Sequence, residues 1–303
     1  MIAELFIIPE SFVNNSNFTI EELEFKIKAL SQDCIQIRKY KADNHLYVHS
    51  DIYNVVFVNG LTVGELLYNP EVAKENIDRD VYNALKTIIM ESANAEYTTA
   101  DIINILLPEH SEDICHGLIA FEEIPKIEQD YQIIYSLQGW YDFRRHFLGL
   151  YPKNPIFFID ECKIYFPDLF FHERNKGTIG TILHNCPKTI VFHLAALNDK
   201  FGSIVIRNMN RTEVLRQFSV ASNFPENASL EGNSARKQDF TFAFLNDDSK
   251  YIDVCCEPHL KLCFNDNYPG DNSYSNDRRI YFHEGIYNIE KNKILIGHIG
   301  NHL

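Results

Sequence analysis

Positive charge is scarce in this sequence. Its 303 residues include 28 Lys and Arg against 42 Asp and Glu, which gives a formal net charge of −14 at pH 7 with histidine neutral. Non-specific nucleic-acid binding depends on the neutralisation of phosphates by Lys and Arg. The charge balance therefore disfavours a general nucleic-acid coat protein and leaves a local basic site as the way to bind RNA.

Long apolar runs are also missing, and no stretch approaches the roughly 18 uncharged apolar residues that a membrane span needs. The first apolar run ends at Pro9 and has no basic leader, so it is too short for a signal peptide. The seven cysteines are odd in number and scattered, which favours reduced thiols over a disulfide framework. We therefore expect a cytoplasmic protein that does not contact membranes.

Several catalytic motifs are absent. The chain has no Gly-x-Gly-x-x-Gly, no phosphate-binding P-loop, no Gly-x-Ser-x-Gly and no His-Glu-x-x-His. Nucleotide-binding, serine hydrolase and metalloprotease functions consequently have no support from motifs, and no cofactor is expected.

The composition is otherwise that of an ordinary folded protein. Apolar residues make up 45% and charged residues 23%, and the 22 Phe and 16 Tyr against a single Trp predict an aromatic core. A chain of this length usually divides into two or three units of roughly 100 to 150 residues. The pattern of elements described next predicts the α+β class.

Residues 1–65 predict a small α+β unit. Thr19 can cap a helix, with Glu22 as its reciprocal partner, and the pair Asn59-Gly60 predicts a turn. Residues rich in β-branched and aromatic side chains predict strands on either side of that helix. The ranges are a helix at 20–30 and strands at 4–8, 34–40, 46–49 and 53–58.

Residues 66–222 carry apolar side chains three and four apart and predict a mostly helical region. The polar stretch 223–238 is punctuated by Pro and Gly and predicts a linker or a surface loop. Residues 239–303 return to strand-like runs and predict an antiparallel sheet interrupted by a loop at 265–277. The expected helices are 70–92, 98–107, 139–150, 189–197 and 211–221, and the expected C-terminal strands are 240–245, 251–256, 259–264, 279–282 and 293–299.

Basic and imidazole side chains gather in the last part of the chain, where 4 of the 12 histidines lie. On strands, alternate residues share a face, so His259 lies on the same face as Lys261, and Arg279 on the same face as Tyr281 and His283. If these faces coincide, they form a cationic pocket suited to metal-independent phosphodiester cleavage, with His or Lys moving a proton and Arg stabilising the phosphate. The alternative is an amphipathic sheet with solvent-facing polar residues.

The order of the last three expected strands resembles that of RelE/HigB-type toxins, which are small ribonucleases. These strands are His259-Leu260-Lys261-Leu262, Arg279-Ile280-Tyr281-Phe282 and Ile294-Leu295-Ile296-Gly297-His298-Ile299-Gly300. The resemblance covers about 45 residues. It implies a bacterial toxin or anti-phage effector that acts on RNA and has a regulatory or antitoxin protein as a partner. It implies catalysis by Lys261, Arg279 and His298, with His302 as a further candidate. Neighbouring side chains of the expected sheet add the substrate contacts His259, Arg278, Tyr281 and His283.

This chain departs from that family in two respects. More than 200 residues precede the matching region, and residues 251–303 hold 5 Lys and Arg against 7 Asp and Glu. RNA binding would thus need a focused basic patch. A non-enzymatic protein-binding module with an acidic surface is the alternative, with the histidines in structural roles.

Three weaker patterns stay open. Arg278 and His283 have the Arg-x4-His spacing of HEPN ribonucleases, although in that family the pair lies on a helix. Asp160, Glu161 and Lys163 contain the Glu-x-Lys half of a metal-dependent PD-(D/E)XK nuclease site. The possible zinc ligands are Cys255, Cys256, His259 and Cys263, in a spacing that fits zinc poorly.

Arg144 and Arg145 stand beside aromatic residues on an expected helix. Such a set can stack on nucleic-acid bases. The alternative is helix packing with both arginines at the surface.

Overall fold

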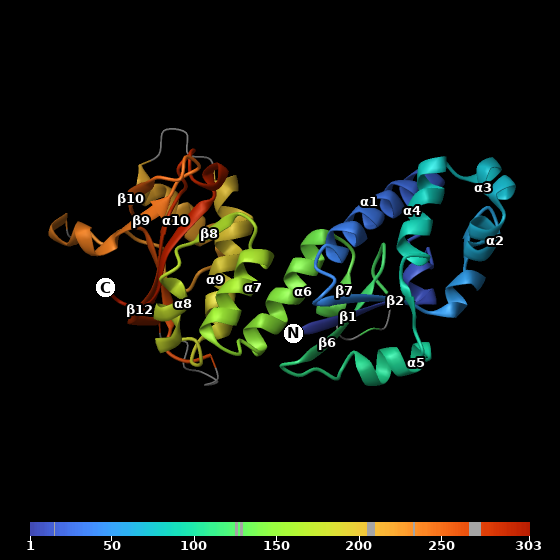
Figure 1. Cartoon of the computed structure of the whole chain (residues 1–303), viewed down its shortest axis with the longest axis horizontal. Helices are drawn as coiled ribbons and strands as arrows, with labels where there is room; N and C mark the ends of the chain where they lie inside the picture. The colour runs from blue at the N-terminus through green and yellow to red at the C-terminus, as the bar shows by residue number, and fades with distance from the viewer. Residues whose placement is uncertain (15, 125–126, 128–129, 205–209, 233, 267–273) are drawn as a thin grey trace. The chain divides into compact units, whose positions relative to one another are not determined.

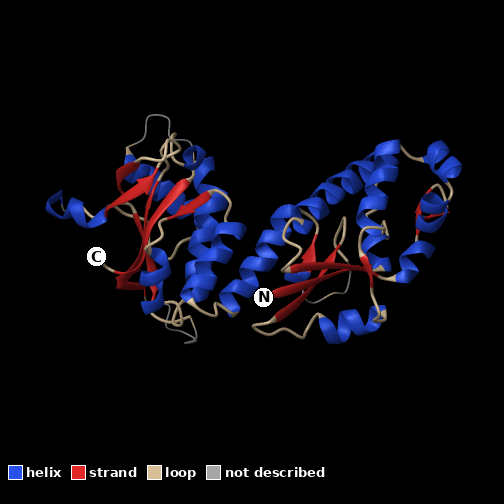
Figure 2. Cartoon of the chain, in the orientation of Figure 1, coloured by secondary structure: helices blue, strands red, loops and turns tan. Residues whose placement is uncertain are grey.

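The computed structural model describes residues 1–14, 16–124, 127, 130–204, 210–232, 234–266 and 274–303, and the chain divides into two compact units, Met1–Arg144 and Arg145–Leu303 (Figure 1). Helices and strands occur in both units, which confirms the α+β class (Figure 2). The predicted divisions at residues 65, 222 and 238 do not coincide with this one. The single boundary falls inside helix α6 (Leu137–Leu150).

A parallel five-stranded sheet forms the centre of the first unit. Its order is β5-β2-β1-β6-β7, and every neighbouring pair runs parallel. Parallel strands need crossover connections, and α1 supplies the one between β1 and β2. The strands are β1 (Ile2–Ile7), β2 (Asn44–Val48), β5 (Ala93–Asn94), β6 (Ile114–Ile119) and β7 (Ile133–Ile134).

Helix α1 (Ile20–Arg38) is longer than the sequence predicted. Thr19 and Glu22 form the expected capping box. The predicted strand at 34–40 is wrong, because the buried stripe of the helix continues through that stretch at helical spacing. Its buried apolar members are Leu23, Ile27, Leu30, Cys34 and Ile37. The alternating Cys-Ile-Gln-Ile at 34–37 imitates a strand only locally.

Among the other helices of the first unit, α4 packs against α1, and α2 contacts both α3 and α4 (Figure 1). They are α2 (Val63–Tyr68), α3 (Pro70–Asn76), α4 (Arg79–Ile89) and α5 (Thr99–Asp101), with 3-10 turns at Pro9–Phe12, Ser50–Asn54 and Asp130–Gln132 and a π-helical turn at Ile102–Leu106. The predicted Asn59-Gly60 turn is confirmed. It joins β3 (Val56–Val58) to β4 (Leu61–Thr62), with positive φ at both residues, 52° and 76°.

A four-stranded sheet of order β11-β12-β13-β8 forms the centre of the second unit. Strands β11, β12 and β13 are antiparallel, as predicted, whereas β8 joins β13 in parallel. The hairpin β9-β10 forms a separate pair. The strands are β8 (Leu169–Phe171), β9 (Thr241–Leu245), β10 (Tyr251–Cys255), β11 (His259–Cys263), β12 (Tyr274–His283) and β13 (Ile294–Asn301).

Residues 66–222 are not uniformly helical. They contain β5, β6 and β7 of the first sheet and β8 of the second. Part of the loop expected at 265–277 is also strand, because β12 begins at Tyr274; residues 267–273 of that loop lie outside the described residues. The helices of the second unit are α7 (Pro155–Tyr165), α8 (Asn175–Thr178), α9 (Pro187–Lys200) and α10 (Arg211–Ser222), with 3-10 turns at Ile179–Thr181, Phe201–Ser203, Ser234–Phe240 and Glu290–Asn292.

The two faces of the second sheet are covered differently. On one face the ring of Phe201, which follows α9, packs edge-on against Phe282 of β12, with the ring centroids 5.6 Å apart. On the other face Phe240 stacks on Tyr281 at 5.2 Å, and the β9-β10 hairpin packs there too. Gly297 is required under this hairpin, since a Cβ at that position would collide with the ring of Phe242.

In the described part of the chain, no helix combines the length and the apolar character needed to cross a membrane.

Candidate functional site

The strand register brings the predicted residues to one face of the second sheet. His259 of β11 lies opposite Tyr281 of β12, and Lys261 lies opposite Arg279. Tyr281 in turn lies opposite His298 of β13. Residues directly opposite each other on neighbouring strands share a face. The two faces that the sequence left separate therefore coincide.

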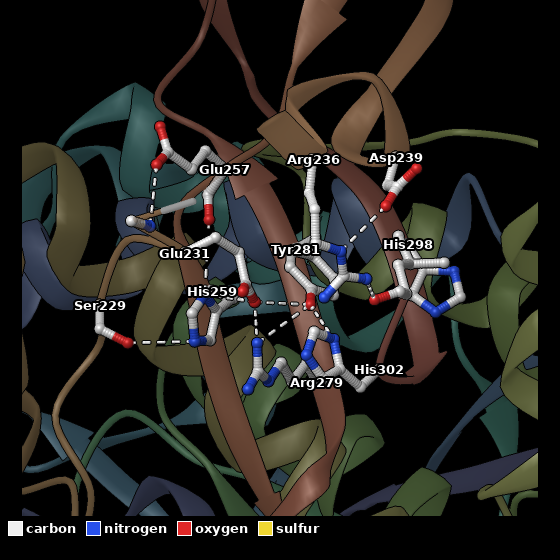
Figure 3. Close-up of polar contacts among 12 residues, drawn as sticks. Ser229, Glu231, Arg236, Asp239, Glu257, His259, Arg279, Tyr281, His298 and His302 are labelled. Atoms are coloured by element: carbon white, nitrogen blue, oxygen red, sulfur yellow. Dashed lines mark hydrogen bonds and ion pairs between the residues drawn. The ribbon is translucent and has the colours of Figure 1, made fainter. Parts of the chain in front are cut away.

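A carboxylate from outside the sheet lies at the centre of this group. Glu231 forms an ion pair with Nη1 of Arg279, and its Oε1 accepts a hydrogen bond from the Tyr281 hydroxyl at 2.8 Å (Figure 3). The same oxygen is 3.6 Å from Nδ1 of His259. The side chains of Glu231 and Arg279 are only 9% and 10% exposed, so the pair is shielded from solvent.

The Tyr281 hydroxyl connects this ion pair to His302. It is 2.8 Å from Nδ1 of His302 and 3.2 Å from Nη1 of Arg279 (Figure 3). A phenol has one proton and a carboxylate accepts only, so Tyr281 donates to Glu231 and accepts from Nδ1–H of His302. That tautomer leaves Nε2 of His302 as a hydrogen-bond acceptor. Burial raises the pKa of Tyr281 to about 12, so the phenol keeps its proton.

The imidazole of His302 is neutral at physiological pH. Burial, together with the charges of Arg279 and Arg236, lowers the pKa of His302 below its usual range. The residue is nevertheless partly exposed, in contrast to Tyr281 and His298. Its backbone N–H donates to the carbonyl of Asp277 at 2.7 Å, which fixes the chain at this point. Within the part of the chain that the structure describes, His302 is therefore the imidazole of this group that combines an acceptor nitrogen without a hydrogen-bond partner with access to solvent.

His259 is held from two sides. Its Nε2 is 3.0 Å from Oγ of Ser229, and a backbone bridge joins the same two residues, with N···O distances of 3.2 and 2.9 Å. Burial lowers the pKa of His259 to about 4. The carbonyl and the carboxylate of Glu257 favour the charged ring, but burial outweighs them. His259 thus orients the segment that carries Glu231.

His298 is turned away from this network. Its Nε2 is 2.9 Å from the carbonyl oxygen of Asn301, and its Nδ1 is buried without a hydrogen-bond partner among the described residues. Burial lowers the pKa of His298 to about 4. Buried Asn175 satisfies the irregular backbone of β13 beside it, accepting from Ile299 N at 2.7 Å. Burial therefore disfavours the charged forms of both His259 and His298.

Two of the expected substrate contacts lie outside the network. Arg278 packs over the Phe264 ring at 4.6 Å and donates to the Phe264 carbonyl. His283 accepts from Gly285 N at 3.1 Å and lies 3.9 Å from Glu284. Both residues are on strand β12, so the Arg-x4-His spacing here lacks the helix on which HEPN ribonucleases carry it.

Lys261 adds a second cation to the same face. Its Nζ is 3.4 Å from Oε2 of Glu226, and the two side chains are 25% and 48% exposed. Each cation of the pair Lys261 and Arg279 is therefore matched by one carboxylate from the segment before the 3-10 turn Ser234–Phe240.

The metal-binding alternatives gain no structural support. Among the described residues, no group of three or more His, Cys, Asp or Glu side chains could hold a metal ion. Asp160 pairs with Lys176 at 2.9 Å, and Lys163 pairs with Glu173 at 2.7 Å. Asp160, Glu161 and Lys163 lie on helix α7, where Asp160 is half exposed and Glu161 is buried.

The expectation that Arg144 and Arg145 lie at the surface is wrong. These residues are 0% and 2% exposed, because the Arg144 guanidinium donates to the Met1 carbonyl and the Arg145 guanidinium pairs with Asp199. Neither residue is available to stack on bases.

Glu231, which completes the network, was missed from the sequence together with Ser229. Both lie in the polar stretch expected to be a linker. The described part of that stretch instead includes a backbone bridge to β11 and the 3-10 turn. A carboxylate among small polar residues gives no periodic signal, so only the tertiary fold reveals its role.

The comparisons with known proteins give no relative. No protein family model, no curated protein and no solved structure matches this chain.

Proposed function

We propose that the second unit is a metal-independent ribonuclease. The observation that carries the proposal is the chain of contacts Glu231, Tyr281 and His302 beside Arg279. It combines an oriented neutral imidazole with a buried guanidinium. These are the two groups that cleavage next to a 2′-hydroxyl requires, a proton acceptor and a stabiliser of phosphate charge.

His302 has the role of general base in this proposal. Its Nε2 takes the proton of the 2′-hydroxyl, and the 2′-oxygen attacks the adjacent phosphorus. The bond from phosphorus to the 5′-oxygen breaks, the leaving oxygen takes a proton from solvent, and a 2′,3′-cyclic phosphate forms. Tyr281 holds the imidazole in the required tautomer, and Glu231 holds Tyr281.

Arg279 and Lys261 have the role of binding the phosphate. They lie directly opposite each other on β12 and β11, a spacing that suits two oxygens of one phosphate or neighbouring phosphates. Arg279 Nε has no hydrogen-bond partner among the described residues. His298 drops out of the catalytic set, because its Nε2 faces Asn301.

A ribonuclease with a negative net charge needs a local basic site to bind RNA, and inside a cell its cleavage of RNA has to be restrained. We propose on this basis a toxin or anti-phage effector that acts on RNA in the cytoplasm and is held by a regulatory protein. Expression in a bacterial host tests this part. The wild-type chain should arrest growth and His302→Ala should relieve the arrest, whereas equal growth of the two strains would contradict the effector role.

The chemical proposal is tested by RNA cleavage in EDTA. His302→Ala should reduce the rate by about 10²- to 10⁴-fold, the usual contribution of a proton-transferring side chain. His283→Ala, on the same sheet but outside the network, is the matched control and should keep the wild-type rate. The product should end in a 2′,3′-cyclic phosphate, and the acid limb of the pH profile should lie below the usual imidazole pKa of about 6.5.

Two results would overturn the proposal. Loss of cleavage in EDTA with recovery in Mg²⁺ would favour a metal-dependent nuclease and redirect attention to Asp160, Glu161 and Lys163. No cleavage of RNA under either condition would favour the protein-binding module, with the network as a structural element.

A further inference from the structure

Two cysteine side chains meet where helix α9 begins beside the end of strand β11. Cys186 is the N-cap residue of α9, and Cys263 is the last residue of β11. The Cys186 sulfur lies 3.6 Å from the carbonyl oxygen of Ile182 and within hydrogen-bonding reach of the Cys263 sulfur, so its single proton can be given to either acceptor. The backbone fixes this approach, because Asp266 N donates to the Asn185 carbonyl at 2.8 Å.

Asp266 and Thr189 hold the Cys263 side chain in place. The Asp266 carboxylate caps α9 by accepting from Lys188 N at 2.6 Å and from Thr189 N at 3.2 Å. The Cys263 sulfur lies 2.9 Å from Oγ1 of Thr189 and 3.1 Å from Oδ1 of Asp266. Its position is therefore set by side chains from both elements.

The two thiols differ in reactivity. The hydrogen bond from Cys186 lowers the pKa of Cys263, and the hydrogen bond from Thr189 acts in the same sense. Burial and the Asp266 carboxylate oppose them, but the net shift is downward. Donating that bond raises the pKa of Cys186, and burial adds to the effect. Cys186 is fully buried whereas Cys263 is 6% exposed. Cys263 is thus the sulfur that forms a thiolate more readily and that an oxidant can reach.

Four other described cysteines have a different environment. Burial raises the pKa of Cys34 to about 12 and raises those of Cys162 and Cys256 as well. Cys255 is the last residue of β10 and is partly exposed. Buried thiols with raised pKa values, such as those of Cys34, Cys162 and Cys256, are inert.

We propose that Cys186 and Cys263 are a redox-active pair that forms a reversible disulfide when the protein meets a hydroperoxide. The Cys263 thiolate attacks the peroxide, whose O–O bond breaks; Cys263 becomes a sulfenic acid, and the peroxide leaves as an alcohol or as water after taking a proton. The Cys186 thiol then attacks the Cys263 sulfur, forms the S–S bond and releases water. One peroxide is reduced by two electrons, and the two thiols are oxidised by two. The pair goes beyond the proposed ribonuclease function and does not rest on it.

The test uses the full-length protein treated with hydrogen peroxide under native conditions, then alkylated after denaturation and digested. A peptide cross-link between Cys186 and Cys263 should appear, with two of the seven thiols protected from alkylation, and dithiothreitol should remove it. Cys186→Ser should stop the reaction at a sulfenic acid on Cys263, which dimedone traps. Cys263→Ser should prevent both products.

The double variant Cys255→Ser, Cys256→Ser is the matched control, because it removes two cysteines outside the pair and should keep the cross-link between Cys186 and Cys263. The proposal is overturned if the dominant cross-link joins other cysteines, or if both thiols stay reduced while folded protein is confirmed by its circular dichroism spectrum. Trapping of the sulfenic acid at Cys186 in place of Cys263 would also overturn the assigned roles.

Discussion

Two buried ion pairs in the second unit show how similar groups serve different ends. Arg145 of α6 forms a bidentate pair with Asp199 of α9, at 2.7 and 3.2 Å. Its Nε donates to the Tyr165 carbonyl at 2.8 Å, and its guanidinium lies over the Phe166 ring at 4.6 Å. Every nitrogen of this guanidinium therefore has an acceptor, and the pair forms a closed network.

The pair of Arg279 and Glu231 is open by comparison. Arg279 Nε lacks a hydrogen-bond partner among the described residues, and burial lowers the pKa of the guanidinium. The Glu231 carboxylate is shared with Tyr281, which leads to the partly exposed His302. A buried charge that is fully paired has no hydrogen-bonding capacity left for a ligand, whereas one with spare capacity can bind a charged ligand. The difference is the reason to locate chemistry at the second pair.

Removal of Asp199 should have the largest effect on stability. Asp199→Ala leaves the Arg145 guanidinium buried without its carboxylate, and loss of one partner of such a pair costs about 3 to 5 kcal/mol. Urea unfolding followed by circular dichroism measures the change. RNA cleavage, where the variant is folded, should stay at the wild-type rate.

An apolar replacement of the whole pair is the control. The double variant Arg145→Met, Asp199→Leu should lose less stability than Asp199→Ala alone, because no unpaired charge remains. Two results would contradict a purely structural role for this pair. One is a double variant whose loss of unfolding free energy equals the sum of the losses of the two single variants. The other is an Asp199→Ala protein that has wild-type stability but no longer cleaves RNA.

Acid should weaken the open network, because His259 belongs to it. The folded-state pKa of His259 is about 4, below the unfolded value of about 6.5. Between these values the unfolded chain binds more protons, so stability rises with pH. Its contribution is complete above about pH 6.5 and is lost as the pH falls toward 4, at about 1.4 kcal/mol per pH unit.

Urea unfolding at several pH values isolates this contribution. Between pH 6 and pH 4.5, His259→Gln should reduce the slope of the unfolding free energy against pH by the contribution of about one proton. The contribution of the remaining buried histidines should persist. Asp199→Ala should keep the wild-type slope, since the closed network contains no imidazole. An unchanged slope in His259→Gln would show that this ring titrates normally in the folded protein.

The fold could be predicted from the sequence where one face of a strand is exposed. Strand β9 alternates buried and accessible residues and was found within one residue of its bounds. Strand β6 was missed, because five of its six residues are buried and a continuous apolar run does not distinguish a strand from a helix. The parallel topology of the first unit was hidden for the same reason.

The candidate site could be predicted only as far as strand geometry reaches. Alternation correctly paired His259 with Lys261 and Arg279 with Tyr281. It could not distinguish His298 from His302, because their difference depends on which atoms each ring nitrogen meets. Glu231 comes from an irregular segment, whose path over the sheet no periodicity describes.

The smallest expected effect on stability concerns the exposed pair of Lys261 and Glu226. Glu226→Gln should change the free energy of unfolding by less than about 1 kcal/mol, because both side chains are partly exposed and solvent screens their attraction.

The same substitution should have a clearer effect on RNA binding than on stability. The substitution releases Lys261 for a phosphate, so binding should tighten, and the slope of log K against log salt should steepen by about 0.7 for one additional phosphate contact. Fluorescence anisotropy with single-stranded RNA in a His302→Ala background measures binding without cleavage. Lys261→Met is the opposite control and should weaken binding with a shallower salt slope. If Glu226→Gln leaves both the affinity and the salt slope unchanged, Lys261 does not face the RNA. Arg279 would then be the residue of this sheet face that binds the phosphate.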